Sequence, residues 1–343
     1  MIPFFKKTAA CFLLFLTNCI YAQLNNITHF SLIESEEEYA TMIEPEDTLF
    51  EKTTIVAFRE VNPIYMLNNE ISYHDFATFC KKTGRKIPKQ LNGNNDLLPV
   101  VNVNYANAND YCKWLSDYYQ IEFRLPTDKE WEYAATIGFS ENKEDQNGVN
   151  KNIIYRNNAK NEKPNCITCT QPNLYGLYHM CGNVWEITEP SDIYANSNSM
   201  IIMGGSFFED ADHVKPNSKL EHTKGLKRAD IGFRIVTSKK EYELLRLTTE
   251  IQEIFNTIND SKFPISITPK GIYKENLFID WFNGFENFYF NEENQTAGFC
   301  CWAQDINNLG KEKESEITFT FKKEQLKYIE KIALLFSRFS FEN

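Results

Sequence analysis

The sequence has no basic patch, no internal repeat and no long low-complexity segment. Its 36 lysines and arginines are outnumbered by 47 aspartates and glutamates, which gives a formal net charge of -11. A protein that binds the phosphate backbone of a nucleic acid needs a basic face, so we expect no nucleic-acid partner. Hydrophobic residues make up 42% of the chain, which is enough to build a packed core.

Histidine is scarce, and cysteine is missing from a long stretch of the chain. No cysteine lies between Cys181 and Cys300. The histidines are scattered along the sequence, at His29, His74, His179, His213 and His222.

The first 22 residues have the pattern of a secretory signal peptide. A pair of lysines precedes a short apolar run from Thr8 to Leu16, and Ala22 supplies a small residue at the expected cleavage site. The run is too short to span a membrane, so we expect no transmembrane helix. The pattern predicts an exported protein, periplasmic or secreted. A second interpretation takes Cys19 in "LTNC" as the lipidated cysteine of a lipoprotein.

Three further regions follow the signal. Residues 23–52 form an acidic lead-in without lysine or arginine up to Glu51, and we expect it to be solvated. Residues 53–238 have mixed helix and strand patterns, which predicts a compact α+β domain. Residues 239–343 change in character and predict a separate small α+β unit.

Local signals place elements within residues 53–238. Gly84 ends the first predicted helix, while Thr127 caps another, with Glu130 as its capping-box partner. The polar stretch 137–171 is expected to be a surface loop. The predicted elements are strands at 53–58, 62–67 and 231–237, an extended run at 98–105, and helices at 68–84, 106–119 and from Thr127 onward.

In the last region, residues 239–260 predict a long amphipathic helix. Residues 317–323 alternate like a half-buried strand, and residues 324–339 predict a final helix. The apolar stripe of the long helix is expected to hold Leu244, Leu247, Ile251, Ile254 and Ile258.

Five motifs occur in a fixed order: "LPVVNVNYANANDYCKWLS", "FRLPTDKEWEYAA", "NLYGLYHMCGNVWEIT", "MGGSFF" and "IGFRIV". Together they resemble the formylglycine-generating enzyme, or sulfatase-modifying factor, family over roughly residues 50–238. The resemblance implies a C-type-lectin-like α+β fold that is rich in irregular loops. It does not cover residues 239–343.

The resemblance also implies where an oxidase of this family keeps its chemistry. Such enzymes hold Cu(I) with two cysteines shortly after the Gly-Gly-Ser motif, near Ser206 here, because soft thiolates suit Cu(I). Counted from that motif, the two positions are Glu209 and Val214. Neither residue is a thiol, so we expect neither copper nor formylglycine generation.

Another metal could use the same place. Glu209, Asp210, Asp212 and His213 form a dense run of hard ligands, which would suit Mn, Fe or Ca better than Cu(I). The alternative is an exposed acidic loop.

A calcium site is a further expectation from the resemblance. The family's site maps onto the carbonyls of Gly182 and Val184 and the carboxylate of Glu186, since calcium prefers oxygen ligands. The remaining side-chain position holds His179, a poor calcium ligand. The alternative is that Glu186 anchors the loop through backbone amides.

The cysteines leave several pairings open. Cys166, Cys169 and Cys181, with His179, could bind zinc, but export favours a disulfide between two of the three cysteines. Cys80 and Cys112 are expected to be small core residues, with a bridge between them as the alternative. Arg124, Glu130 and Arg234 are expected to act structurally.

Three hypotheses for function follow. The first is a non-catalytic binding or assembly protein of the bacterial envelope, with a protein or peptide partner. The second is an enzyme with altered, metal-dependent oxidative chemistry at Glu209 and His213. The third is a C-type-lectin-like module that binds a peptide or glycan through the loops at 139–172 and 207–230.

Overall fold

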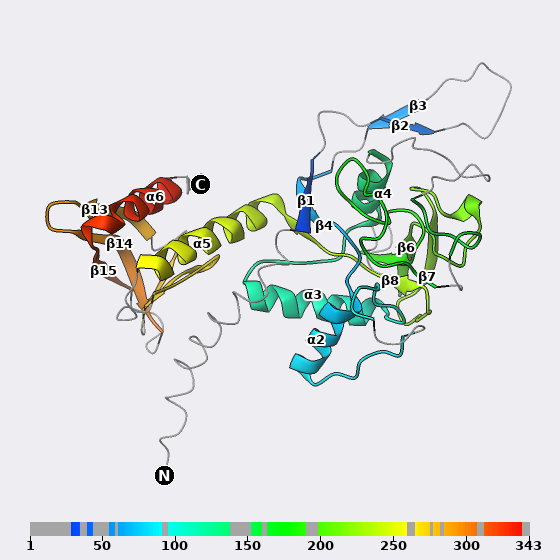
Figure 1. The fold of residues 1–343 in the computed structure, drawn as a ribbon, viewed down its shortest axis with the longest axis horizontal. Helices are drawn as coiled ribbons and strands as arrows, with labels where there is room; N and C mark the ends of the chain where they lie inside the picture. The colour runs from blue at the N-terminus through cyan, green and yellow to red at the C-terminus, as the bar shows by residue number, and fades with distance from the viewer. Residues whose placement is uncertain are drawn as a thin grey trace, which may run out of the picture. The chain divides into compact units, whose positions relative to one another are not determined.

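The computed structural model divides the chain into two compact units, and the boundary between them in the sequence lies between Lys239 and Lys240. Figure 1 shows the helices and strands of both units. We call residues 27–118 and 122–239 the N-terminal unit, and residues 240–343 the C-terminal unit. The predicted signal peptide, with Cys19, lies outside the described residues. The described residues are 29–34, 40–43, 55–58, 61–90, 95–137, 152–159, 163–189, 198–258, 265–274, 277–281, 285–306 and 312–337.

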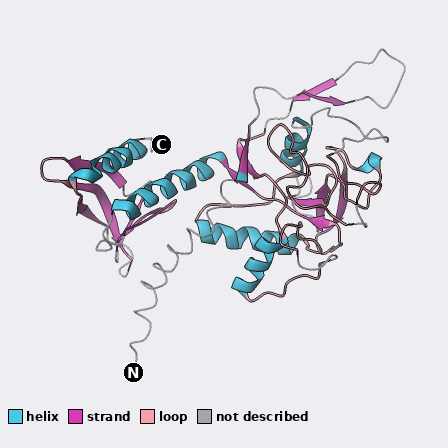
Figure 2. Ribbon diagram, viewed as in Figure 1, coloured by secondary structure: helices cyan, strands magenta, loops and turns pink. Residues whose placement is uncertain are grey.

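Helices and strands occur in both units (Figure 2), and the expected α+β class is confirmed. In the N-terminal unit, a three-stranded antiparallel sheet has the order β1-β4-β9, and β2 pairs with β3. A four-stranded sheet has the order β7-β6-β5-β8. The strand bounds are β1 Phe30–Ile33, β2 Ala40–Ile43, β3 Ile55–Phe58, β4 Ile64–Leu67, β5 Trp185–Thr188, β6 Ser199–Met203, β7 Lys219–Thr223, β8 Ile231–Gly232 and β9 Val236–Ser238.

The acidic lead-in is not fully solvated, contrary to expectation. Strand β1 pairs with β4 and buries Ile33 completely. An apolar "FSLI" segment within an acidic stretch therefore belongs to the core. The apolar alternation of four residues was too short to stand out against the surrounding charge.

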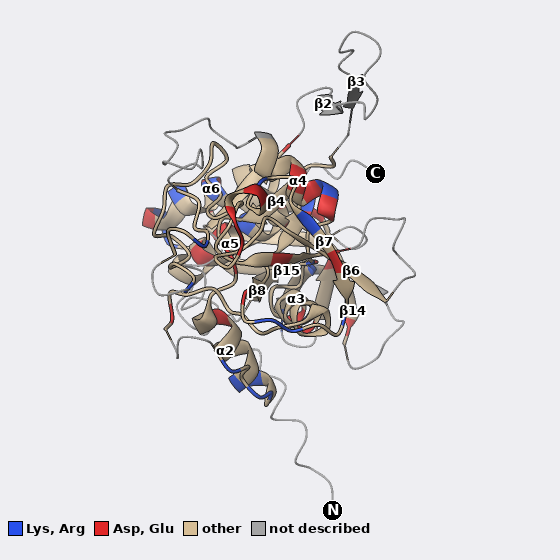
Figure 3. Ribbon diagram, turned by 90° about the vertical axis from the view of Figure 1, so that its right-hand side faces the viewer, with Lys and Arg blue, Asp and Glu red and all other residues tan. Residues whose placement is uncertain are grey.

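Three helices support the N-terminal unit: α2 at Tyr73–Thr83, α3 at Tyr105–Tyr119 and α4 at Asp128–Ile137. Ser72 caps α2, and Gly84 ends it with a φ of 69°, as predicted. The last turn of α2 carries Lys81 and Lys82, which complement the helix dipole (Figure 3). The predicted capping box of α4 is confirmed, because Thr127 and Glu130 exchange hydrogen bonds at 3.1 and 2.8 Å.

Other predictions for this unit need correction. The run at 98–105, expected to be extended, makes an isolated bridge between Pro99 and Ser72, but its last residue, Tyr105, already belongs to α3. The predicted strand at 231–237 is split into β8 and β9. The stretch 137–171 is not simply surface loop, because Tyr155 is fully buried.

The C-terminal unit is two helices and an antiparallel sheet. The sheet has the order β10-β11-β12-β14-β13, with β15 on β14, and a bulge between Phe285 and Asn287. The bounds are α5 Lys239–Ile258, β10 Ile265–Thr268, β11 Gly271–Lys274, β12 Leu277–Asp280, β13 Phe285–Asn291, β14 Thr296–Asp305, β15 Glu312–Thr320 and α6 Leu326–Ser337.

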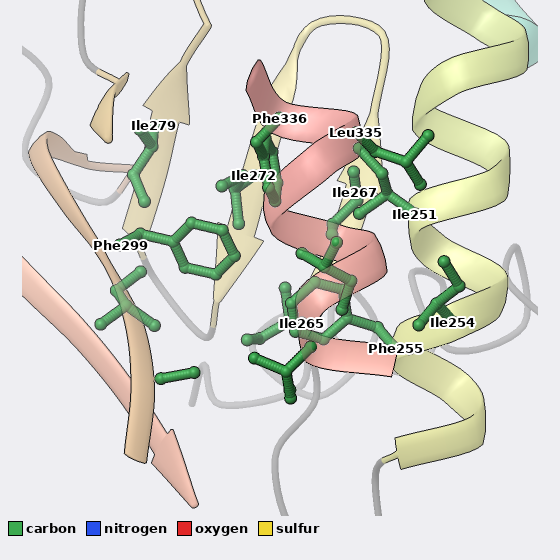
Figure 4. Close-up of a cluster of buried hydrophobic side chains, with 14 of the residues drawn as sticks. Ile251, Ile254, Phe255, Ile265, Ile267, Ile272, Ile279, Phe299, Leu335 and Phe336 are labelled. Carbon is green, nitrogen blue, oxygen red and sulfur yellow. The ribbon is translucent and has the colours of Figure 1, made fainter. Parts of the chain in front are cut away.

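Helices α5 and α6 share one core with the sheet (Figure 4). Ile251 and Phe255 from α5 and Phe336 from α6 lie in the same cluster as Phe299 of β14. The predicted stripe of α5 is only partly right. Leu245 is buried, while Leu244 is half-exposed. The buried positions in the first half of the helix are Tyr242 and Leu245, so the stripe is shifted there, whereas Ile251, Ile254 and Ile258 are buried as predicted.

Candidate functional site

Two glycines follow β6 and shape the segment that carries the candidate site. Gly204 and Gly205 have φ values of 93° and 82°, which L side chains rarely adopt. A Cβ atom on Gly205 would run into the carbonyl oxygen of His213 and a γ-carbon of Val214. The glycines therefore allow the backbone at Gly205 to lie directly against residues 213–214.

Ser206, the predicted pocket residue, is fully buried. Its Oγ donates to Oδ2 of Asp230 at 2.8 Å and accepts from the amide of Phe208 at 3.2 Å. Asp230 also accepts from Nε and Nη2 of Arg228, at 3.0 and 2.6 Å. The serine hydroxyl therefore holds a turn and a buried carboxylate in place.

Glu209, the first predicted cysteine position, extends this arrangement. Its Oε1 accepts from Nε1 of Trp185 at 3.1 Å and lies 3.6 Å from Nη2 of Arg228. Its side chain is 22% exposed. We call Trp185, Glu209, Arg228, Asp230 and Ser206 the Glu209 network, since each member contacts the next.

Val214, the second predicted cysteine position, is a core residue. It is 2% exposed and packs in a cluster with Ile153, Tyr155 and Cys181. Burial raises the pKa of the Cys181 thiol, so this cysteine acts as a small apolar side chain. The position of the second cysteine is thus occupied by a valine that is part of the apolar core.

The acidic run after Glu209 does not converge on one point. Asp210 pairs with Arg156 at 3.1 Å, and Asp212 pairs with Lys215 at 3.3 Å. His213 is exposed at the end of a short 3-10 helix, Ala211–His213. Among the described residues, no three His, Cys, Asp or Glu side chains gather closely enough to hold a metal ion.

Glu186 lies on β5, the strand between antiparallel β6 and parallel β8, where it is fully buried. Arg234 donates to both of its oxygens, from Nε to Oε2 at 2.6 Å and from Nη2 to Oε1 at 2.7 Å. Nε1 of Trp131 donates to Oε2 at 2.7 Å. The structural role expected for Arg234 is confirmed, and Glu186 anchors the loop through side chains rather than backbone amides.

These contacts test the expected calcium site at Gly182, Val184 and Glu186. A divalent cation at the Glu186 carboxylate would face the guanidinium of Arg234, which already occupies both oxygens. His179 does not assist, because its Nε2 lies 3.0 Å from the carbonyl oxygen of Cys166. The donor set present in this chain does not fit calcium.

Sequence reasoning missed the buried carboxyl group of Glu70. Nδ2 of Asn183 donates to its Oε1 at 2.7 Å, while its Oε2 has no hydrogen-bond partner among the described residues. Burial, and then the charge of Glu186, raise the pKa of Glu70 to about 8. The raised pKa favours the protonated form of Glu70, which limits the negative charge around Arg234.

The cysteines of the "CITC" motif form a disulfide between Cys166 and Cys169, with a Cα–Cα distance of 5.2 Å. This confirms the prediction that two of the three nearby cysteines pair. The alternative of a zinc site is wrong, because two of its three cysteines are joined in the disulfide and cannot act as thiolate ligands. Cys80 and Cys112 are buried and unpaired, which confirms the core prediction for both.

The sulfatase-modifying factor enzyme 1-like domain family matches residues 37–239. The chain belongs to this family. It is similar to the mouse protein named inactive C-alpha-formylglycine-generating enzyme 2, with 29% identity over 160 residues. It is also similar to the mouse formylglycine-generating enzyme, with 32% identity over 106 residues.

These matches cover only part of each protein. The first covers 41% of this chain and 49% of the relative, so the chain spans about half the length of that relative. The second covers 26% of each protein. Among solved structures, PvdO from Pseudomonas aeruginosa is similar in fold, with a TM-score of 0.51 and 18% identity. That match covers 61% of this chain and 94% of PvdO.

In this family member, the two thiol positions hold a polar network and a core valine. Arg228 and Asp230 of the Glu209 network were missed, because the segment before "IGFR" has only the pattern of a polar, basic loop. The bridging role expected for Arg124 and Glu130 is confirmed by contacts of 2.8 and 2.7 Å. Within the described part of the chain, no helix is both long and apolar enough to cross a membrane.

Proposed function

We propose that this chain is an exported, non-catalytic member of its family that serves as a binding or assembly protein of the bacterial envelope, with a protein or peptide partner. One observation carries the non-catalytic part. Both positions where thiols would hold copper are used for structure, Glu209 by hydrogen bonds and Val214 by burial. A relative bearing the name of an inactive enzyme supports the same view.

The Glu209 network also argues against altered metal chemistry at this place. The carboxylate of Glu209 is held by Trp185 and Arg228, and the cation of Arg228 repels a metal ion. His213 is exposed, and the two aspartates before it pair with basic residues. The described residues therefore support a structural rather than an oxidative role for this segment.

Metal analysis of the purified chain tests this proposal. We expect less than stoichiometric copper, iron and manganese, and no oxidation of a cysteine-containing peptide. The variants Glu209→Ala and His213→Ala should leave the metal content unchanged. The matched control is Glu221→Ala, an exposed carboxylate on β7. A stoichiometric metal that is lost in the first two variants and kept in the control would refute the non-catalytic role.

Export has its own test. The chain is produced with its first 22 residues in a bacterial host, and the intact mass of the mature protein is measured. The proposal requires a chain that begins at Gln23 and is found outside the cytoplasm. A lipid-modified chain that begins at Cys19 would instead support a lipoprotein, and an uncleaved cytoplasmic chain would reject export.

A further inference from the structure

The sheet of the C-terminal unit has two faces with different chemistry. On one face, Ile272, Ile279 and Phe299 pack in the core that α5 and α6 share (Figure 4). Successive residues of a strand point to opposite faces. The alternate residues of the same strands therefore lie on the other side of the sheet, which we call the outer face.

Aromatic side chains mark the outer face. Tyr273 lies opposite Phe278, and their ring centroids are 4.7 Å apart. On β14, Trp302 lies between the buried Cys301 and Ala303, and it is 43% exposed. Nε1 of Trp302 donates to Oε1 of Glu286 at 2.8 Å. This hydrogen bond orients the indole ring while the side chain stays accessible.

The charge of the outer face has one sign. Asp280 lies opposite Gly271, in register with the outer row, and Glu314 lies opposite Trp302. Strands β10 to β15 contain two lysines, and both fall in the other rows. Lys274 lies opposite Leu277, and Lys313 lies opposite Ala303. The described strands thus place acids and aromatic residues in the rows of the outer face, and neither of their two lysines is in register with these rows.

We propose that the outer face binds a segment of another protein that is rich in lysine or arginine. A cation above an indole ring is attracted by the π-electrons of the ring. Carboxylates at its edge attract the same cation and give the encounter its electrostatic steering. Trp302, flanked by Glu286 and Glu314, offers both.

Charge decides between this partner and the alternatives. A second copy of the chain would bring the same acids and a net charge of -11, so like charges would oppose the contact. A neutral glycan would use the aromatic rings and could donate hydroxyl hydrogen bonds to the carboxylates, but it has no positive charge to complement the acids of this face. The surface lies outside residues 37–239, so the proposal does not depend on the function proposed above.

The test uses the full-length chain and a fluorescein-labelled peptide of about ten residues that alternates lysine and glycine. Fluorescence polarisation measures its dissociation constant, and a peptide that alternates glutamate and glycine serves as the opposite-charge control. We expect only the lysine peptide to bind, and more weakly as salt rises, because salt screens exposed charges. Trp302→Ala and Glu314→Lys should each weaken binding about tenfold or more.

A matched control separates the surface from the overall charge. Glu330→Lys makes the same charge change as Glu314→Lys, but on an exposed position of α6, which packs against the opposite face of the sheet. It should change the dissociation constant less than about twofold. Trp302→Phe keeps an aromatic ring and should weaken binding less than Trp302→Ala, with circular dichroism confirming that each variant is folded.

Four outcomes would overturn the proposal. The lysine peptide does not bind, or Glu330→Lys weakens binding as much as Glu314→Lys does. Sedimentation velocity shows a dimer that Trp302→Ala dissolves, which assigns the face to a second copy. Finally, a neutral oligosaccharide such as cellohexaose or chitohexaose competes with the peptide, which assigns the face to a glycan.

Discussion

Arg234 and Glu186 form a bidentate ion pair in the interior of the N-terminal unit, with N···O distances of 2.6 and 2.7 Å. Both side chains are almost completely buried, at 0% and 1% exposure. Arg234 also donates to the carbonyl of Tyr178 at 2.7 Å. The ion pair therefore ties the segment between β8 and β9 to β5, and the bond to Tyr178 ties the same segment to the loop before β5.

Removing the cation should be strongly destabilising. Arg234→Met leaves Glu186 buried without its partner, so we expect the free energy of unfolding to fall by about 3–5 kcal/mol. Urea unfolding followed by tryptophan emission measures the change. In Arg156→Met, which removes an exposed pair with Asp210, the loss should stay below about 1 kcal/mol. Equal losses in the two variants would show that the buried pair contributes no more to stability than the exposed pair.

The buried carboxyl of Glu70 should make stability depend on pH. Its folded-state pKa is raised from 4.5 to about 8, so between these values the folded state keeps a proton that the unfolded state has lost. The free energy of unfolding therefore falls as pH rises, by about 1.4 kcal/mol per pH unit for one proton. The contribution of Glu70 to this free energy is lost fully only above its folded-state pKa.

His179 acts in the opposite direction over a lower range. Burial lowers its pKa from 6.5 to about 4, so its contribution to stability is lost as pH falls through that window. The effect of Glu70 is therefore clearest between about pH 6.5 and 8. Glu70→Gln should remove the slope there, and the exposed Glu221→Gln should not. An unchanged slope in Glu70→Gln, measured by urea unfolding at several pH values, would mean that Glu70 is ionised in the folded protein.

Two glycines with similar backbone angles should respond differently to alanine. Gly84 has a φ of 69° and nothing within 4 Å of an added Cβ, so Gly84→Ala should cost about 1–2 kcal/mol from backbone strain alone. Gly182 has a φ of 73°, but its Cβ would meet the carbonyl of Ile154. Gly182→Ala should cost a further 1–3 kcal/mol or so in urea unfolding. Similar costs at both positions would contradict the close approach.

The Cys166–Cys169 disulfide closes a very short loop. In the chain-entropy account, such a bridge stabilises by about 2 kcal/mol, less than a bridge across a long loop. A reductant should therefore lower the melting temperature of the wild-type chain modestly. It should have no effect on the double variant Cys166→Ser, Cys169→Ser. If the reductant still lowers the melting temperature of the double variant, the prediction is wrong, because the sensitive bond would then lie elsewhere.

Local signals in the sequence predicted local structure well. Gly84 and the Thr127–Glu130 capping box act within one helical turn, so a short window contains all the information. The bridge within "CITC" is local in the same sense. Motif order also located the domain, since the family match covers residues 37–239.

Contacts between distant segments could not be predicted in this way. Glu70 and Asn183 are 113 positions apart, and nothing near either residue indicates the other. The Glu209 network depends on how the segment 228–230 approaches β5. In the C-terminal unit, the bulge after Phe285 interrupts the alternation of β13, which hides that strand from a period-two pattern.

The Glu209 network opposes the introduction of a thiol at position 209. A mutation of Glu209 to cysteine would leave the indole N–H of Trp185 without its acceptor and leave Arg228 with one acidic neighbour in place of two. A cysteine at position 214 would sit inside the apolar cluster of Tyr155 and Cys181, where a thiolate is disfavoured. The first substitution alone would weaken the Glu209 network, and the second alone would bury a thiol. Neither by itself would create a copper site. Both substitutions together, with changes in the side chains around them, would be needed to place two accessible thiols at these positions.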